Sequence, residues 1–189
     1  MKIRRALIGV LAASGLFALL AASLNTSERL VWNATASAPI GLYWVETDSP
    51  LAVGDYLAVR PAPDLANWLA QRGYVPKGAL LIKRLAALSP SAVCRTGDVI
   101  TIDGAFAAQA KRTDRAGRPL AEWRGCHRLE ARQLFLLNPA AGSLDGRYFG
   151  PLDARAVVGR AVRLRLPGVR HDALSLPEKP SAFVRPNKP

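Results

Sequence analysis

The first 24 residues constrain this chain more than any other segment. Lys2, Arg4 and Arg5 precede an uncharged apolar run of eighteen residues from Ala6 to Ser23. At a helical rise of about 1.5 Å per residue, that run just spans a hydrocarbon core of roughly 30 Å. Cations beside a membrane helix stay on the cytoplasmic side, so the rest of the chain is expected on the far side.

Two interpretations of this segment are open. It is an uncleaved anchor that crosses the inner membrane once, or a secretory signal cleaved near the small residues Ala21, Ala22 and Ser23. The run exceeds the roughly 7 to 15 apolar residues usual for a signal, which favours the anchor. Both interpretations predict export to the periplasmic, extracytoplasmic side.

The chain divides into three parts on this evidence. Residues 1–24 are expected to be the membrane anchor, and residues 25–167 are long enough for one exported domain with a hydrophobic core. Residues 168–189 are rich in proline and poor in apolar residues, so a disordered tail is expected there.

The net charge of +12, from 26 basic and 14 acidic residues, raises the question of nucleic-acid binding. The expected export argues against it, and so does the lack of a basic stripe interleaved with aromatic residues. A solvated basic face beside anionic lipid headgroups accounts for the charge.

No metal or cofactor is expected, because no ligand cluster or phosphate-binding glycine loop occurs.

The two cysteines, Cys94 and Cys126, would meet oxidising conditions in an exported domain. A disulfide between them is one possibility, and two separate buried thiols are the other. The two histidines, His127 and His171, do not give zinc-site spacing with them.

Short β-forming segments dominate the exported part, which predicts a mainly β fold without βαβ units. A helix is expected over residues 64–72, with Asp64 as its N-cap and Gly73 after its end. Residues 107–125 are polar and basic and are expected to form a loop or flap. The predicted strands cover residues 41–45, 55–60, 79–88, 97–104, 133–137 and 156–165.

Serine hydrolysis requires a nucleophile, a base and an oxyanion donor. Neither histidine is well placed to be the base, and no Gly-x-Ser-x-Gly elbow occurs. Strand alternation puts Lys83 on the same face as Leu81 and Leu85. Burial on an apolar face lowers the pKa of a lysine, and the neutral amine can then accept a proton.

Several segments, taken in order, resemble the successive motifs of the signal peptidase I family. The main ones are residues 35–43 (TASAPIGLY), 81–85 (LIKRL) and 142–150 (GSLDGRYFG). Val53-Gly54-Asp55 and residues 158–161 (VGRA) resemble supporting motifs. The resemblance covers nearly the whole exported domain and implies a signal-peptidase-like β-sheet or barrel domain behind one N-terminal transmembrane helix.

The resemblance also implies a catalytic Ser/Lys dyad. Ser37 matches the nucleophile and Lys83 the general base, while Ser143 matches a serine that hydrogen-bonds and orients the lysine. The amide of Ser37 and the hydroxyl of Thr35 match the oxyanion hole.

Asp145 and Arg147 match an acidic and a basic residue of the same motif as Ser143. We expect them to form an ion pair that supports the Ser143 loop, and the aspartate is linked to activity in one subfamily. A solvated pair on a loop is the alternative.

The segment that contains Ser37 is closest to the SxPxGxY form of TraF-type conjugal transfer peptidases. Ala38 stands where many relatives have methionine, which changes the expected pocket. This resemblance implies processing of an exported precursor such as a conjugative pilin, with possible joining of its ends. The alternatives are a general signal peptidase for many preproteins and a non-catalytic accessory of a secretion apparatus.

Overall fold

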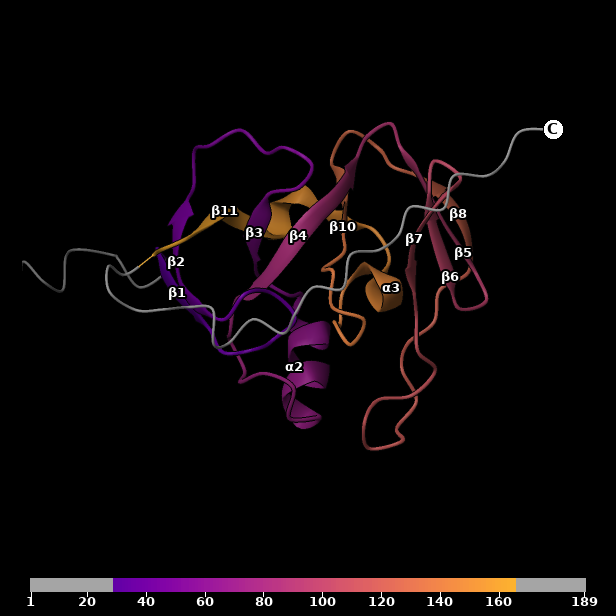
Figure 1. Cartoon of the computed structure of the whole chain (residues 1–189), viewed down its shortest axis with the longest axis horizontal. Coiled ribbons are helices and arrows are strands. Elements are labelled where there is room, and N and C mark those ends of the chain that lie inside the picture. Colours follow the sequence, from indigo (N-terminus) through magenta and orange to yellow (C-terminus); the bar gives the residue numbers. More distant parts are fainter. Residues whose placement is uncertain (1–28, 166–189) are drawn as a thin grey trace, which may run out of the picture.

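The computed structural model describes residues 29–165, which form two antiparallel sheets beside two short helices (Figure 1). The larger sheet has seven strands in the order β1-β2-β11-β3-β4-β9-β10, and the smaller has four in the order β7-β6-β5-β8. The strands of the larger sheet are β1 (Leu30–Asn33), β2 (Gly41–Glu46), β3 (Tyr56–Val59), β4 (Leu81–Leu88), β9 (Gln133–Leu136), β10 (Leu152–Asp153) and β11 (Val157–Arg163). Those of the smaller sheet are β5 (Ala92–Thr96), β6 (Val99–Ile102), β7 (Ala105–Gln109) and β8 (Gly125–Arg128).

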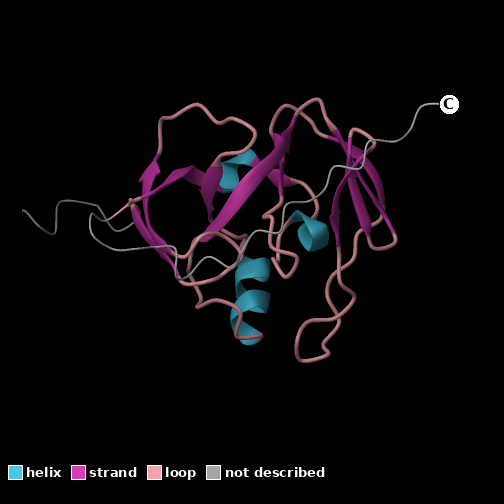
Figure 2. Cartoon of the chain, viewed as in Figure 1, coloured by secondary structure: helices cyan, strands magenta, loops and turns pink. Residues whose placement is uncertain are grey.

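The predicted mainly β class is confirmed, as the distribution of strand and helix in Figure 2 shows. Strands β1 and β10 end the larger sheet without pairing with each other, so this sheet is open and not a closed barrel. The segment predicted to cross the membrane, residues 1–24, and the predicted tail, residues 168–189, lie outside the described residues. Within residues 29–165 no helix is long and apolar enough to span a bilayer.

Strand β11 joins the early and middle parts of the chain, because it pairs with β2 on one side and with β3 on the other. Gly159 allows this close approach, since a Cβ there would lie 2.4 Å from the carbonyl oxygen of Glu46. The next residue, Arg160, donates to the Glu46 carboxylate at 2.6 Å. The motif at residues 158–161 therefore has a structural explanation.

Strand β4 is shared between the two halves of the molecule. Residues 81–84 pair with β3, and the next residue, Leu85, packs with Leu57 and Leu134 in the core of the larger sheet. Near the end of β4, Ala87 belongs to a second hydrophobic cluster, which also contains Val93 of β5. Strand β4 therefore contributes to both packed cores.

The predicted helix is α2 (Pro63–Gln71), but its N-cap is Ala62 and makes no side-chain cap bond. The prediction of Asp64 as N-cap is wrong, because Pro63 occupies the start of the helix, where its fixed φ fits and its missing N–H costs nothing. Gly73 follows the C-cap with φ of +70°, as expected. Leu69 is buried, and the ring of Trp68 packs edge-on against Phe149.

The sequence interpretation missed five strands: β1, β5, β7, β8 and the two-residue β10. All four residues of β8 are exposed, and β7 has a single buried residue, Ala108, so neither shows the alternation of a half-buried strand. Of the predicted loop at 107–125, residues 110–124 lie between β7 and β8, while its two ends belong to those strands.

The structure joins Cys94 and Cys126 in a disulfide. The two residues lie directly opposite each other on β5 and β8. The bond therefore ties the far edge of the smaller sheet to the strand beside it.

Candidate active site

Lys83 is the third residue of β4, opposite Leu57 of β3. Its side chain is 6% exposed, and its Nζ donates to Ser143 Oγ at 3.2 Å. A buried ammonium requires hydrogen-bond partners or the loss of its proton. Ser143, itself 1% exposed, supplies one partner.

The pKa of Lys83 is lowered to about 8 because burial penalises the charged form. The nearby Asp145 carboxylate acts in the opposite direction, and the Arg147 guanidinium lowers the pKa further. A substantial fraction of neutral amine is then present just above neutral pH, which is the form that can accept a proton.

Asp145 and Arg147 form the buried ion pair that supports the Ser143 loop, with side chains 0% and 4% exposed. Asp145 is the N-cap of α3 (Gly146–Phe149) and accepts from the Arg147 amide, while Arg147 Nη1 donates to Asp145 Oδ2 at 2.8 Å. Arg147 Nη1 also donates to the carbonyl oxygen of Ser143 at 3.3 Å. The alternative of a solvated pair does not fit these contacts.

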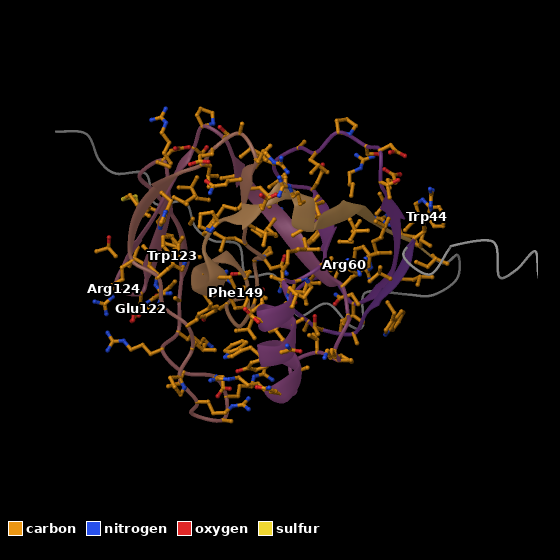
Figure 3. The ribbon with its side chains drawn as sticks, turned by 180° about the vertical axis from the view of Figure 1, so that it is seen from behind. Trp44, Arg60, Glu122, Trp123, Arg124 and Phe149 are labelled. Carbon is orange, nitrogen blue, oxygen red and sulfur yellow. A yellow bond between two sulfur atoms is a disulfide. The ribbon has the colours of Figure 1, made fainter. Side chains whose placement is uncertain are left out.

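The short helix α3 packs directly on β9, and the 110–124 loop covers it. A Cβ on Gly146 would lie 2.7 Å from both the Leu136 carbonyl oxygen and the Phe135 ring, so only glycine fits this contact. Trp123 donates from its indole nitrogen to the carbonyl oxygen of Gly146 at 2.8 Å. Figure 3 shows Trp123 beside this helix, whose last residue is Phe149.

Asn138 is a buried site residue that the sequence interpretation missed. It lies 1% exposed between β9 and the Ser143 loop. Its side chain accepts from the Arg84 amide at 2.7 Å and donates to the Ile82 carbonyl at 3.1 Å. No periodic pattern marks such a residue, and its one signal is a polar side chain directly after an apolar strand.

Ser37 lies in the loop between β1 and β2, which two side chains hold in shape. Asn33 donates to three carbonyl oxygens of this loop, those of Thr35, Ala38 and Pro39, at 3.0 to 3.1 Å. The buried Tyr43 donates from its hydroxyl to the Pro39 carbonyl at 2.6 Å, and burial raises its pKa to about 12. The sequence interpretation assigned no role to Asn33.

Thr35 and Ser37 are in hydrogen-bond contact, with 3.0 Å between their hydroxyl oxygens. Thr35 Oγ1 also donates to Asn33 Oδ1 at 2.9 Å, so in this arrangement the Ser37 hydroxyl donates to Thr35. Ser37 is half-buried and Thr35 is exposed. The loop thus brings together the two residues predicted to form the oxyanion hole.

The Ser37 loop and strand β4 share a hydrophobic cluster, because Ala38 and Ile82 both belong to it. These residues are the chain neighbours of Ser37 and Lys83. No hydrogen bond joins Ser37 to Lys83 among the contacts of residues 29–165: Lys83 bonds Ser143, and Ser37 bonds Thr35.

A small apolar cavity of about 30 Å³ adjoins Lys83 and is lined by Leu81, Leu136, Leu144 and Phe149 among others. A larger hollow, of about 260 Å³, lies at the start of α2 and contains none of the predicted catalytic residues. In the described part of the chain no three histidine, cysteine or acidic residues cluster as metal ligands would.

Comparison with known proteins places the chain in a family. The model of "Signal peptidase, peptidase S26" matches residues 3–165. The chain belongs to this family. The predicted recognition is therefore confirmed, and the family is one of serine peptidases.

The similar curated proteins are conjugal transfer proteins. A plasmid transfer protein TraF of Escherichia coli is 31% identical over 163 residues, which are 80% of this chain and 90% of the relative. Conjugal transfer proteins TraF of Agrobacterium tumefaciens (strain 15955) and Agrobacterium fabrum (strain C58) are 37% and 34% identical, covering 80% and 84% of this chain and 90% and 94% of the relatives. A crystal structure of a signal peptidase I from Enterococcus faecalis matches with a TM-score of 0.35 and 20% identity, covering 61% of this chain and 98% of that one.

Proposed function

We propose that this peptidase uses Ser37 as nucleophile and Lys83 as general base. The observation that carries the proposal is the burial of Lys83 in a setting that lowers its pKa to about 8, with Ser143 bonded to its amine. A lysine kept partly neutral near physiological pH has the property that a base requires. The shared cluster of Ala38 and Ile82 supports the approach of the two residues.

The reaction proceeds in two steps. Ser37 Oγ attacks the scissile carbonyl carbon while its proton passes to neutral Lys83 Nζ. The resulting oxyanion accepts from the Ser37 amide and the Thr35 hydroxyl, which turns from Asn33 to the substrate oxygen. Collapse expels the amine, which takes the proton from Lys83, and leaves an acyl-enzyme that water or another amine resolves.

We further propose that the substrate is an exported precursor protein, in particular a conjugative pilin. The names of the TraF relatives support a role in conjugal transfer. An acyl-enzyme resolved by water gives a cut chain, whereas one resolved by the pilin's own amino terminus gives a ring. Both products follow from the same Ser37 ester.

The proposed location is the periplasmic face of the inner membrane, where residues 1–24 anchor the chain. An apolar face on β1, β2 and β11 supports contact with lipid. Trp32 is 65% exposed and Leu30 is 43% exposed, and Trp44 lies opposite both Leu30 and Val162. Figure 3 shows Trp44 at the edge of the molecule farthest from the smaller sheet. Aromatic and aliphatic side chains of this kind favour a bilayer interface.

The test is mass spectrometry of candidate pilin incubated with membranes that contain the full chain. Wild type should give a shortened pilin, and loss of one further water identifies the ring. Ser37→Ala and Lys83→Ala should both abolish processing, whereas Ser49→Ala and Lys77→Ala serve as matched controls and should retain it. Unchanged processing by either active-site variant would overturn the dyad.

Substrate breadth is tested with the same preparation. Unrelated signal-bearing preproteins should remain intact when they are incubated with wild-type membranes. Their efficient cleavage would favour a general signal peptidase. A folded protein that cuts nothing and forms no adduct with a serine-reactive lactam would favour a non-catalytic accessory.

A further inference from the structure

Asn138 contacts both peptide units that join Lys83 to its neighbours in β4. The Ile82 carbonyl belongs to the unit before Lys83, and the Arg84 amide belongs to the unit after it. Asn138 donates to the first at 3.1 Å and accepts from the second at 2.7 Å. One side-chain amide thus takes the place that a neighbouring strand would occupy along this part of β4.

The backbone of strand β9 cannot supply these bonds, because the strand ends at Leu136. Leu137 still donates its amide to the Arg84 carbonyl at 3.0 Å. The backbone of Asn138 then turns towards the ion pair: its amide donates to Asp145 Oδ2 at 3.0 Å, and its carbonyl accepts from Arg147 Nη2 at 2.8 Å. Only the side chain of Asn138 is left to pair with the β4 backbone on either side of Lys83.

The same loop also holds the other end of the lysine. Arg147 bonds the Ser143 carbonyl, and Ser143 Oγ accepts from Lys83 Nζ. The main chain of Lys83 is therefore fixed through Asn138 and its amine through Ser143, and both fixing residues are tied to the Asp145–Arg147 pair. Hydrogen bonds to a single loop therefore hold Lys83 at both ends, at its backbone and at its amine.

Only asparagine fits this position among residues of its size. The contact needs one acceptor and one donor on a short planar group, which an amide provides. Aspartate would put an acceptor against the Ile82 carbonyl, and leucine would leave both backbone groups unpaired in a buried place, which costs free energy.

We propose that Asn138 is a positioning residue that holds Lys83 in its buried, proton-accepting place. This inference rests on the proposed function of Lys83 as the base. In Asn138→Ala, two backbone groups beside Lys83 lose their partners, so we expect β4 to relax there and water to reach the amine. Because hydration favours the charged form, the pKa of Lys83 should rise towards its ordinary value.

The first test is the pH dependence of precursor processing by the full chain in membranes. Asn138→Ala should lower kcat by about 10- to 100-fold with little change in KM, and should move the midpoint of the rising limb upward by at least about half a pH unit. Asn67→Ala, on the exposed side of α2, is the matched asparagine control and should leave both unchanged. Val93→Ala, in the smaller sheet, controls for a loss of stability without a change beside Lys83.

A second readout does not depend on activity. In the Ser37→Ala background, competitive acetylation of Lys83 across pH, measured by mass spectrometry of its peptide, reports the midpoint directly. Asn138→Ala should raise this midpoint and Val93→Ala should not. An Asn138→Ala protein with the wild-type midpoint, or a shift equal to that of Val93→Ala, would overturn the positioning role.

Failure of this inference is distinguishable from failure of the dyad. If Ser37→Ala or Lys83→Ala still processes the precursor, the dyad itself is wrong. If those variants are inactive and Asn138→Ala leaves the acetylation midpoint of Lys83 unchanged, only the positioning role is wrong.

Discussion

Lys83 Nζ and Ser143 Oγ lie 3.2 Å apart, in a contact that joins two segments sixty residues apart in sequence. Both residues are buried, so water does not compete for this bond. The hydroxyl can accept from the ammonium and can donate to the neutral amine, and so serves both protonation states.

Removing the Ser143 hydroxyl should slow the reaction more than it weakens binding. In Ser143→Ala the amine of Lys83 loses its hydrogen-bonded partner, which costs about 1 to 3 kcal/mol in a buried setting. We expect kcat to fall by about 10- to 100-fold at an almost unchanged KM. Steady-state kinetics on a precursor peptide measure this, with Ser49→Ala as the control; equal rates in the two variants would contradict it.

Activity should increase with pH through the range set by Lys83. Its pKa is lowered to about 8, so below that pH most of the lysine is protonated and cannot accept the Ser37 proton. The value of kcat/KM should rise about tenfold per pH unit below the midpoint and level off above it. A profile measured from pH 6 to 10 that falls between 7 and 9 would rule out a lysine base.

The Thr35 hydroxyl should matter to the rate and its methyl group should not. Thr35→Val keeps the shape and removes the donor, and loss of one oxyanion donor lowers kcat by about 100- to 1,000-fold. Thr35→Ser keeps the donor and should stay within about tenfold of wild type by the same argument. Kinetics of the two variants side by side give the answer, and equal losses would assign Thr35 a packing role instead.

Two ion pairs of different burial should differ in their effect on stability. Asp145→Asn leaves the buried Arg147 without its counter-charge, which typically costs about 3 to 5 kcal/mol. Glu46→Gln breaks the half-exposed pair with Arg160, where water competes for both charges, so the loss of stability should be much smaller. Urea unfolding of the two variants should show this order; a reversal would mean that the Asp145 site admits water.

Loss of the disulfide should lower stability while the reaction itself persists. The Cys94–Cys126 bond closes a loop of 32 residues in sequence separation, for which chain entropy gives about 3 to 4 kcal/mol. The double variant Cys94→Ser with Cys126→Ser should unfold at lower urea than wild type, and reductant should bring wild type to the same midpoint. At temperatures where both are folded, processing rates should agree, since neither cysteine contacts Lys83 or Ser143.

The sequence predicted those features that are marked by residues close together in the chain. Lys83 was recognisable because ordered motifs surround it, and the strand around it is long and apolar. Asn33 and Asn138 were missed because each serves backbone groups brought near only by folding, and single asparagines are common in turns. Strand β8 was missed because its pairing with β5 depends on backbone bonds and a disulfide, with no buried side chain to mark it.

The position of β11 has a consequence for the folding of the enzyme during its synthesis. Ser37, Lys83 and Ser143 all precede Val157, yet the strand that carries the Ser37 loop reaches the strand beside Lys83 only through β11. A nascent chain that ends before residue 157 contains every proposed catalytic group but lacks the strand that joins β2 to β3 in the sheet. We therefore expect the domain to acquire proteolytic activity only after β11 has been synthesised and has paired with both β2 and β3.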